Sequence, residues 1–472
     1  MLEDTDYLVV GAGASGLAFA DSLVATADAV EVTIVDTRPA PGGHWLSAYP
    51  FVRLHSPSSY YGVNSLPLGE DAIDLVGQNA GYYERATGQE VRDHFEAAAQ
   101  RLDDTGRVRL LAGHEYLGPD SAGERIRHLA SGGVTRLKVR RKVVDARYLE
   151  GSIPATHAPS FGVAAGARFV PVNDLPAVAD SASSYAVIGS GKTAADACIW
   201  LLENGTDPDR IRWVRPREAW FYDRRHFQPL AQVGGIVEGL ALDAESGAAS
   251  ESVDSLLERL EGCGRLVRID PSRPAAMFRG TMLSSPELQA LREIQDVVRL
   301  GHVRRIEPGR ILLTHGEIET VRSTVHVDCT ALGLSDAPAI PVFQHGLIVL
   351  QQVRHLSPCF NAALIGFVES ERDDDEEKNR LCPPNPYPQS VEDWPRMTAT
   401  TWKAEGRWLR EPDLAEWIAG CRLNLLGALP DHAGDESVRS AFERYLTNVS
   451  AATTQLVSLG RTDEPQRYST TQ

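Results

Sequence analysis

Residues 185–202 read YAVIGSGKTAADACIWLL, in which an apolar run is followed by a glycine-rich loop and a helical pattern. The GSGKT segment invites comparison with a P-loop, whose pattern G-x-x-x-x-G-K-[ST] places four residues between its glycines. Counted back from Gly191 and Lys192, the first glycine of a P-loop should stand where this chain has Ala186. The spacing therefore excludes a P-loop.

The pattern that fits is G-x-G-x-x-A, at Gly189, Gly191 and Ala194. In a dinucleotide-binding unit these small residues permit a tight turn, close approach to a pyrophosphate and close packing of strand and helix. The same order of elements opens the chain, where DYLVV (6–10) precedes GAGASG (11–16), LAFADSLV (17–24) and EVTIVD (31–36). Two such units predict an α/β fold with two Rossmann-type dinucleotide-binding domains.

The residues that end the second strand of each unit distinguish the two ligands. The first unit ends on Asp36, and an acid at this place accepts hydrogen bonds from an adenosine ribose. The second unit has Arg215 there, with Arg217 close by, and arginine pairs with a 2′-phosphate. We therefore expect FAD or NAD in the first unit and NADPH in the second. Lys192 would add charge near the phosphates, and a solvated surface position for Arg217 stays open.

Changes in composition predict how the chain is divided. Residues 40–70 form a loop rich in Pro, Gly, Ser and aromatic residues, and such a long loop in a compact domain is usually functional. Residues 151–180 are predicted to be a linker. We expect the first part of an FAD-binding domain over 1–178, an inserted NADPH-binding domain over 179–326, and the second part of the FAD-binding domain with a C-terminal helical segment over 327–472.

Other segments carry local predictions. The pattern over 285–300 predicts a helix that begins at Ser285 and Pro286 and ends at Gly301. The acidic run ESERDDDEEKN (369–379) is expected to be a solvated loop. Four tryptophans of the C-terminal region are expected to be packing residues: Trp394, Trp402, Trp408 and Trp417.

Charge and cysteine content exclude several classes of function. The formal net charge of −17 argues against nucleic acid or an anionic membrane as the main partner. The six cysteines are scattered with no C-x-x-C pair, so no metal site, iron–sulfur cluster or dithiol centre is expected. The acidic N-terminus is unlike a signal peptide, and no apolar run is long enough to span a membrane. A cytoplasmic protein is expected, and the Arg- and Ala-rich composition suggests a bacterial source.

Several motifs together resemble those of the flavin-containing monooxygenases and their Baeyer–Villiger relatives. They are GAGASG, GGHW (42–45), AYP (48–50) and the second G-x-G-x-x-A, followed by Asp196. VDCTALGL (327–334) resembles the segment that returns from the NADPH domain to the FAD domain, and NAALIGFVE (361–369) resembles a late strand beneath the flavin. The resemblance extends to about residue 385.

The resemblance implies roles for individual residues. For FAD they are Gly11, Gly13, Ser15, Gly16 and Asp36, with Gly43, His44 and Trp45 toward the flavin; for NADPH they are Gly189, Ser190, Gly191, Lys192, Thr193, Arg215 and Arg217. Arg53, His55 and Asn64 are the catalytic candidates, and Asn64 would correspond to an asparagine that supports the flavin peroxide. A turn position for Asn64 and a structural role for His55 stay open.

The implied activity is a FAD-dependent, NADPH-consuming monooxygenase that oxygenates a small molecule through a peroxyflavin intermediate. Two departures refine this expectation: the linker signature F-x-G-x-x-x-H-x-x-x-[WY] is missing, and His55 stands where Baeyer–Villiger enzymes have an aspartate. Oxidation of an amine or sulfide is therefore favoured over that of a ketone. An NADPH-dependent flavin reductase or oxidase is the alternative, followed by a nucleotide sensor. Oligomeric state is not predicted.

Overall fold

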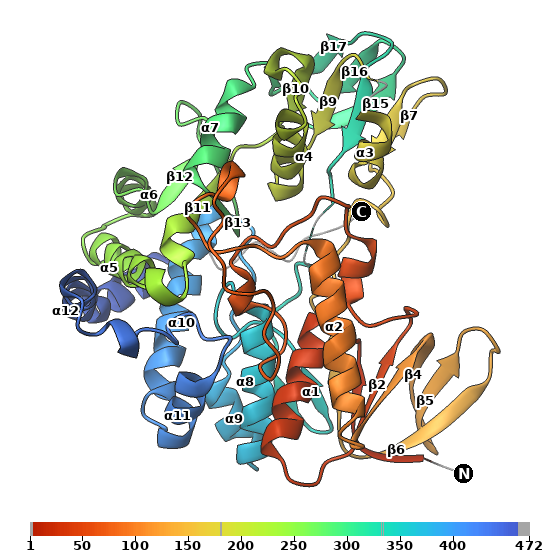
Figure 1. Ribbon diagram of the computed structural model, residues 1–472, viewed down its shortest axis with the longest axis vertical. Helices are drawn as coiled ribbons and strands as arrows, with labels where there is room; N and C mark the ends of the chain where they lie inside the picture. The colour runs from red at the N-terminus through yellow and green to blue at the C-terminus, as the bar shows by residue number, and fades with distance from the viewer. Residues whose placement is uncertain (1–2, 180–181, 332, 334, 461–472) are drawn as a thin grey trace.

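The computed structural model of the protein describes residues 3–179, 182–331, 333 and 335–460. Its first sheet has the order β19–β20–β6–β1–β2–β3, and β4 and β5 form a hairpin that joins β6. These strands are β1 (Glu3–Val10), β2 (Val32–Asp36), β3 (Val108–Ala112), β4 (His114–Asp120), β5 (Gly123–His128), β6 (Val134–Asp145), β19 (Phe343–Gln344) and β20 (Leu347–Val349). Helix α1 (Ala14–Thr26) connects β1 to β2 and contacts both α2 (Gly88–Asp103) and α8 (Pro358–Glu371) (Figure 1).

The second sheet is parallel, with the order β14–β10–β9–β18–β8. Its strands are β8 (Phe169–Pro171), β9 (Tyr185–Ile188), β10 (Ile211–Val214), β14 (Val297–Val298) and β18 (Val325–Asp328), and α4 (Lys192–Glu203) joins β9 to β10. Every residue of β9 is buried, as is typical of a parallel strand covered on both faces. The chain returns to the first sheet after β18, so the second unit is inserted in the first. The expected fold class is confirmed.

Two smaller sheets complete the β structure. One has the order β12–β11–β13, from β11 (Ala219–Asp223), β12 (Leu266–Arg268) and β13 (Met277–Leu283). The other has the order β17–β16–β15–β7, from β7 (Gly162–Val163), β15 (Val303–Glu307), β16 (Arg310–Leu313) and β17 (Gly316–Glu319). The remaining α-helices are α3 (Leu175–Val178), α5 (Gly234–Ala248), α6 (Val253–Gly262), α7 (Ser285–Glu293), α9 (Asp375–Leu381), α10 (Trp394–Trp408), α11 (Pro412–Gly420) and α12 (Glu436–Leu459).

The C-terminal helices pack against the inserted part of the chain. Helix α12 lies along α5, at the left of Figure 1, and α10 contacts α12. The four tryptophans are packing residues, as expected: Trp394, Trp402 and Trp408 are buried, and Trp417 stacks on Phe367 with ring centroids 4.9 Å apart.

The helix predicted over 285–300 is shorter than expected. Ser284, not Ser285, is its N-cap and forms a capping box with Glu287, and the helix ends at Glu293. Val297 and Val298 instead pair with β10. These β-branched residues fit a pleated strand better than a helix, and the neighbouring sheet edge supplies backbone partners.

The strand predicted at NAALIGFVE is wrong, because residues 361–369 lie within helix α8. Pro358 occupies the first turn, where a proline costs no hydrogen bond. Ala362, Ala363 and Gly366 are small enough to let this buried helix approach α1 closely. Because α8 is buried all round, its sequence lacks the amphipathic period that would have identified it as a helix.

Two segments expected to be irregular contain regular structure. Within the expected linker 151–180, β7 pairs with β15 and β8 pairs with β18. Within the acidic run, Asp374 caps α9, and the Nζ atom of buried Lys378 pairs with buried Glu369 at 2.6 Å. A capping acid and a buried ion pair explain why this charged run is ordered. The division of the chain at 178 and 326 stays a prediction.

The approach of α8 to α1 predicts the effect of one methyl group. A Cβ atom on Gly366 would lie 2.7 Å from the carbonyl oxygen of Phe19. We therefore expect Gly366→Ala to lower the free energy of unfolding by about 1–3 kcal/mol. The matched control Gly406→Ala, in α10 with open space around its Cβ position, should raise it by about 0.5–1 kcal/mol. Urea denaturation measures both, and equal stabilities of the two variants would contradict the packing.

Candidate nucleotide-binding sites and their junction

The first glycine loop is built around contacts that exclude side chains. Gly11 has a φ of +113°, and a Cβ atom on Gly16 would lie 2.0 Å from the carbonyl oxygen of Gly11. Gly13 is the N-cap of α1, and no side chain caps the helix. The first N–H groups of α1 are therefore available to an anion such as a pyrophosphate, beside which Ser15 lies in the first turn.

The GGHW segment lies directly on this loop. The Gly42 N–H donates to the Ala12 carbonyl at 2.9 Å, and a Cβ atom on Gly43 would lie 3.0 Å from the Cα atom of Gly13. Two glycines thus face each other across the start of α1. Because neither glycine has a Cβ atom, the space between them stays open. A pyrophosphate, which has to approach the backbone closely, fits such a space.

Asp36 ends β2 and is buried. Its Oδ2 atom accepts the Ala12 N–H at 2.7 Å, and its Oδ1 atom accepts the Arg38 N–H at 2.8 Å. Each carboxylate oxygen has two acceptor positions, so both oxygens can accept a further hydrogen bond from a ribose hydroxyl.

The second glycine loop repeats the geometry with more open space. Gly189 has a φ of +143°, and a Cβ atom there would lie 2.9 Å from the Cys329 carbonyl oxygen. Gly191 is the N-cap of α4, has no side-chain cap and has nothing within 4 Å of its Cβ position. The Ser190 hydroxyl accepts the Arg217 N–H at 3.3 Å, while the Arg217 side chain is exposed.

Arg215 is the strongest sign of an anion in the second unit. Its guanidinium lies 4.7 Å above the centre of the Trp213 ring, and its Nη2 atom donates to Glu218 at 3.1 Å. The residue is only 3% exposed, yet Nε and Nη1 have no hydrogen-bond partner. Burial also lowers the pKa of Arg215. Buried donors without partners are costly, and a 2′-phosphate would satisfy them.

Lys192 points away from the loop surface. It is buried, and its Nζ atom pairs with Asp196 one turn along α4 and lies 4.0 Å from Glu287. Thr193 contacts the Tyr49 side chain from the same helix turn. The lysine charge is therefore directed into the protein, where it balances carboxylates.

The 44–64 segment contains the remaining candidates, but it does not bring them together. The Trp45 Nε1 atom donates to the Tyr61 hydroxyl at 2.8 Å. Arg53 is exposed and donates to the Arg85 carbonyl at 3.1 Å. His55 lies near Lys192, Asp196 and Arg224, whereas the Asn64 side chain accepts the Arg422 N–H at 2.9 Å.

Desolvation decides the protonation of His55, which is partly buried, whereas His44 is exposed. Desolvation lowers the pKa of His55 to about 4. Its side chain is therefore neutral at pH 7. A neutral imidazole can donate one hydrogen bond and accept another, but it does not supply positive charge.

Sequence reasoning missed a buried ionic cluster at the junction of the two units. Glu287 accepts ion pairs from Arg224 at 2.7 Å and Arg85 at 3.3 Å, and these contacts hold its pKa below the usual range although desolvation opposes them. Arg224 is fully buried, and its Nε atom donates to the His55 carbonyl at 3.1 Å. The capping-box spacing from Ser284 to Glu287 was the one local signal, and it does not reveal the partners.

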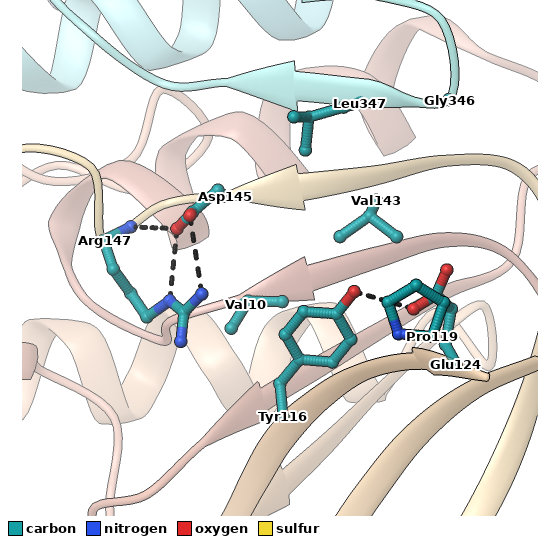
Figure 2. A pocket seen from close by; sticks show the side chains of 9 residues that line it. All are labelled: Val10, Tyr116, Pro119, Glu124, Val143, Asp145, Arg147, Gly346 and Leu347. Carbon is teal, nitrogen blue, oxygen red and sulfur yellow. Dashed lines mark hydrogen bonds and ion pairs between the residues drawn. The ribbon is translucent and has the colours of Figure 1, made fainter.

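A cavity of about 210 Å³ lies close to the first unit, between the parallel strands and the β4–β5 hairpin (Figure 2). Asp145 and Arg147 pair at its rim, and the Tyr116 hydroxyl donates to Glu124 at 2.7 Å. None of the candidate site residues lines this cavity, so it adds nothing to the glycine-loop sites.

Among the described residues, no cluster of His, Cys, Asp and Glu has the arrangement of a metal site. No described helix is both long and apolar enough to cross a membrane.

Burial of His94 predicts a pH dependence. Its Nε2 atom accepts the Val63 N–H at 3.1 Å, and desolvation lowers its pKa from 6.5 to about 4. Between these values the unfolded chain binds the extra proton, so this contribution to stability is present above pH 6.5 and is lost as the pH falls toward 4. His94→Gln keeps an acceptor and should reduce the slope of unfolding free energy against pH by about 1.4 kcal/mol per pH unit. Urea denaturation across this window measures the slope.

The exposed His345 provides the control for this measurement. His345→Gln should keep the parent slope. An unchanged slope in His94→Gln would show that His94 titrates normally in the folded chain.

Comparisons with known proteins agree with the two-unit geometry. Residues 9–61 match the family model described as an NAD(P)-binding Rossmann-like domain. The polycyclic ketone monooxygenase of the fungus Thermothelomyces thermophila superposes with a TM-score of 0.51 at 12% identity, over 98% of this chain and 89% of that one. Cyclohexanone monooxygenase of Rhodococcus sp. Phi1, bound to NADP⁺, superposes with a TM-score of 0.50 at 15% identity, over 93% and 98%.

Sequence relatives are mycobacterial. The uncharacterized protein Rv2000 of Mycobacterium tuberculosis strain H37Rv is 44% identical over 428 residues, which cover 90% of this chain and 78% of that protein. The uncharacterized protein Mb2023 of Mycobacterium bovis matches equally well. The chain belongs to the family of these mycobacterial proteins, and its fold is that of the class B flavin monooxygenases, with two dinucleotide-binding units.

Proposed function

We propose that the protein is a FAD-dependent, NADPH-consuming monooxygenase that oxygenates a small molecule. The observation that carries this proposal is Arg215, a buried arginine with two unpartnered donors beside the open glycine loop of the inserted unit. It favours a nucleotide with a 2′-phosphate in the second unit. The first unit, with a buried acid at the equivalent strand end, suits an unphosphorylated ribose such as that of FAD.

The two cradles assign binding residues to each cofactor. In the first unit the start of α1 and the Gly42–Gly43 turn would bind the FAD pyrophosphate, and Asp36 would orient the ribose. In the second unit the start of α4 would bind the NADPH pyrophosphate, and Arg215 would bind the 2′-phosphate. Held by these residues, the two nucleotides would supply hydride transfer and the reduction of molecular oxygen, while the chain supplies their placement.

The residues of the 44–64 segment would then shape the reaction chamber. The hydrogen-bonded Trp45 and Tyr61 would exclude water from it. Neutral His55, which stands where Baeyer–Villiger enzymes have an aspartate, favours oxidation of an amine or sulfide over that of a ketone. Arg53 is proposed to supply positive charge, and Asn64 a hydrogen-bonding amide, near the flavin. A cytoplasmic location, a small-molecule substrate and oxygen as partners belong to the same proposal.

The function is tested by reducing the FAD-loaded protein anaerobically with NADPH and mixing it with oxygen in a stopped-flow spectrometer. A monooxygenase should show a spectral species between the reduced and oxidised flavin, and an amine or sulfide substrate should shorten its lifetime. Direct return to oxidised flavin, with every candidate substrate added, would instead establish a reductase or oxidase. Failure to bind FAD on reconstitution would refute the proposal.

Arg215 predicts the choice of nicotinamide nucleotide. Arg215→Gln should weaken NADPH binding by about 10- to 100-fold, because charge-assisted hydrogen bonds to the phosphate are lost. NADH, which has no 2′-phosphate, should bind parent and variant within about twofold of each other. The measurement is the concentration dependence of anaerobic flavin reduction with each nucleotide.

The exposed Arg217 two positions on gives the matched control, and Arg217→Gln should have the smaller effect. Equal losses with NADPH and NADH in Arg215→Gln would contradict the assignment of Arg215 to the phosphate.

A further inference from the structure

A single carboxylate joins the two nucleotide-binding units. The Tyr49 hydroxyl, from the segment that follows the first glycine loop, donates to the Oδ2 atom of Asp196 at 2.7 Å. The Oδ1 atom of the same carboxylate pairs with Lys192. Asp196 lies on α4, directly after the second glycine loop. One side chain thus receives a donor from each unit.

Burial makes this arrangement specific. The Lys192 side chain is 5% exposed and that of Asp196 is 15% exposed, so the loss of either charge would leave the other one partly desolvated. Burial and the neighbouring Asp196 raise the pKa of Tyr49 well above its usual value, so the hydroxyl keeps its proton and donates at neutral pH. A charge-assisted hydrogen bond in such surroundings is both strong and directional.

Other contacts dock residues 47–55 on the inserted unit. Phe51 stacks on Trp200 of α4, with ring centroids 5.1 Å apart and planes 25° apart. The Asn173 amide donates to the Ser47 carbonyl at 3.1 Å. At the far end, Arg224 donates to the His55 carbonyl. The inserted unit therefore contacts the segment at Ser47, Tyr49, Phe51 and His55. The first unit holds its start through Gly42 and its second half through two backbone hydrogen bonds, from the Leu54 N–H to the Ala86 carbonyl and from the Gly88 N–H to the Val52 carbonyl.

Charge alternates across this junction. Lys192 lies between Asp196 and Glu287, and Glu287 lies between Lys192, Arg85 and Arg224. Four of these charges belong to the inserted unit and Arg85 comes from the first, so the cluster is complete only when both parts of the chain are in place. This cooperativity favours one relative position of the two glycine loops.

We propose that Tyr49 and Asp196 are positioning residues that hold the 47–55 segment against α4 and so fix the first nucleotide relative to the second. Lys192 is the counter-ion that orients Asp196. This inference rests on the proposed function for the identity of the nucleotides. The docking itself is a property of the chain without them, so the two can be tested separately.

The test compares Tyr49→Phe, Asp196→Asn and the double variant with the parent. Tyr49→Phe removes only the bridging hydroxyl, and the single amide oxygen of Asp196→Asn cannot serve both Tyr49 and Lys192. Tyr116→Phe is the matched control, because its hydroxyl also donates to a carboxylate at 2.7 Å but lies on the β4–β5 hairpin. Retained thermal unfolding transitions establish that each variant folds.

Hydrogen–deuterium exchange of the nucleotide-free proteins gives the first readout. Amides of residues 47–55 should exchange roughly three- to tenfold faster in each variant, as expected for the loss of one hydrogen bond. The increase in exchange rate in the double variant should be smaller than the product of the increases in the two single variants, because each single variant removes the same interaction. Unchanged exchange in this segment, or an equal change in Tyr116→Phe, would overturn the docking.

The second readout is the rate of anaerobic flavin reduction at saturating NADPH. In Tyr49→Phe and Asp196→Asn it should fall about tenfold while NADP⁺ affinity stays within about twofold, because misplacement of the reactants affects the rate more than binding. Faster exchange with an unchanged reduction rate would overturn the positioning role. If NADPH fails to reduce the parent as well, the proposed function fails, and the exchange result still decides the docking.

Discussion

The rest of the structure depends on one constraint: the glycine loops before helices α1 and α4 have no room for a side chain at some of their glycines. At the first glycine loop, Gly16 contacts the Gly11 carbonyl so closely that no Cβ fits, and Gly43 meets Gly13 across the start of α1. At the second loop, a Cβ atom on Gly189 would also come too close to the Cys329 carbonyl oxygen, at 2.9 Å. These contacts fix the angle at which each helix leaves its strand. They also leave the first N–H groups of α1 and α4 without side-chain caps, directed to where a phosphate would bind.

The two cradles have the same backbone plan and differ in electrostatics. The first is bordered by buried Asp36, which accepts two backbone N–H groups. The second is bordered by buried Arg215, whose donors are only partly satisfied. A buried carboxylate already supplied with donors is stable without a ligand, whereas a buried guanidinium with unpartnered N–H groups gains stability when an anion arrives. Under the proposed function, the inserted unit would therefore exert the stronger electrostatic selection between nucleotides.

The segment between the cradles belongs to both units. It starts in the first unit at the Gly42–Gly43 turn, and the inserted unit holds it through Tyr49, Phe51 and the His55 carbonyl. The buried charges at this junction tolerate little displacement, because a displaced charge would lose its partner while it was still shielded from water. They are Lys192, Asp196, Glu287, Arg85 and Arg224. Tyr49 is thus held by an ionic cluster that is remote in sequence, and Phe51 by the Trp200 ring.

The sequence by itself determined the two strand–glycine–helix units, the exclusion of a P-loop and the contrast between Asp36 and Arg215, because each depends on residues close together in the chain. It did not determine helix α8, whose uniformly apolar sequence suits a strand or a buried helix equally, nor the end of α7, which is set by pairing of Val297 and Val298 with β10. The partners of Asn64 and Glu287 were also beyond it. Asn64 meets Arg422, and Glu287 meets Arg85 and Arg224, across separations that no local pattern records. Only the tertiary structure decides such contacts, because an ion pair or hydrogen bond depends on distance in space.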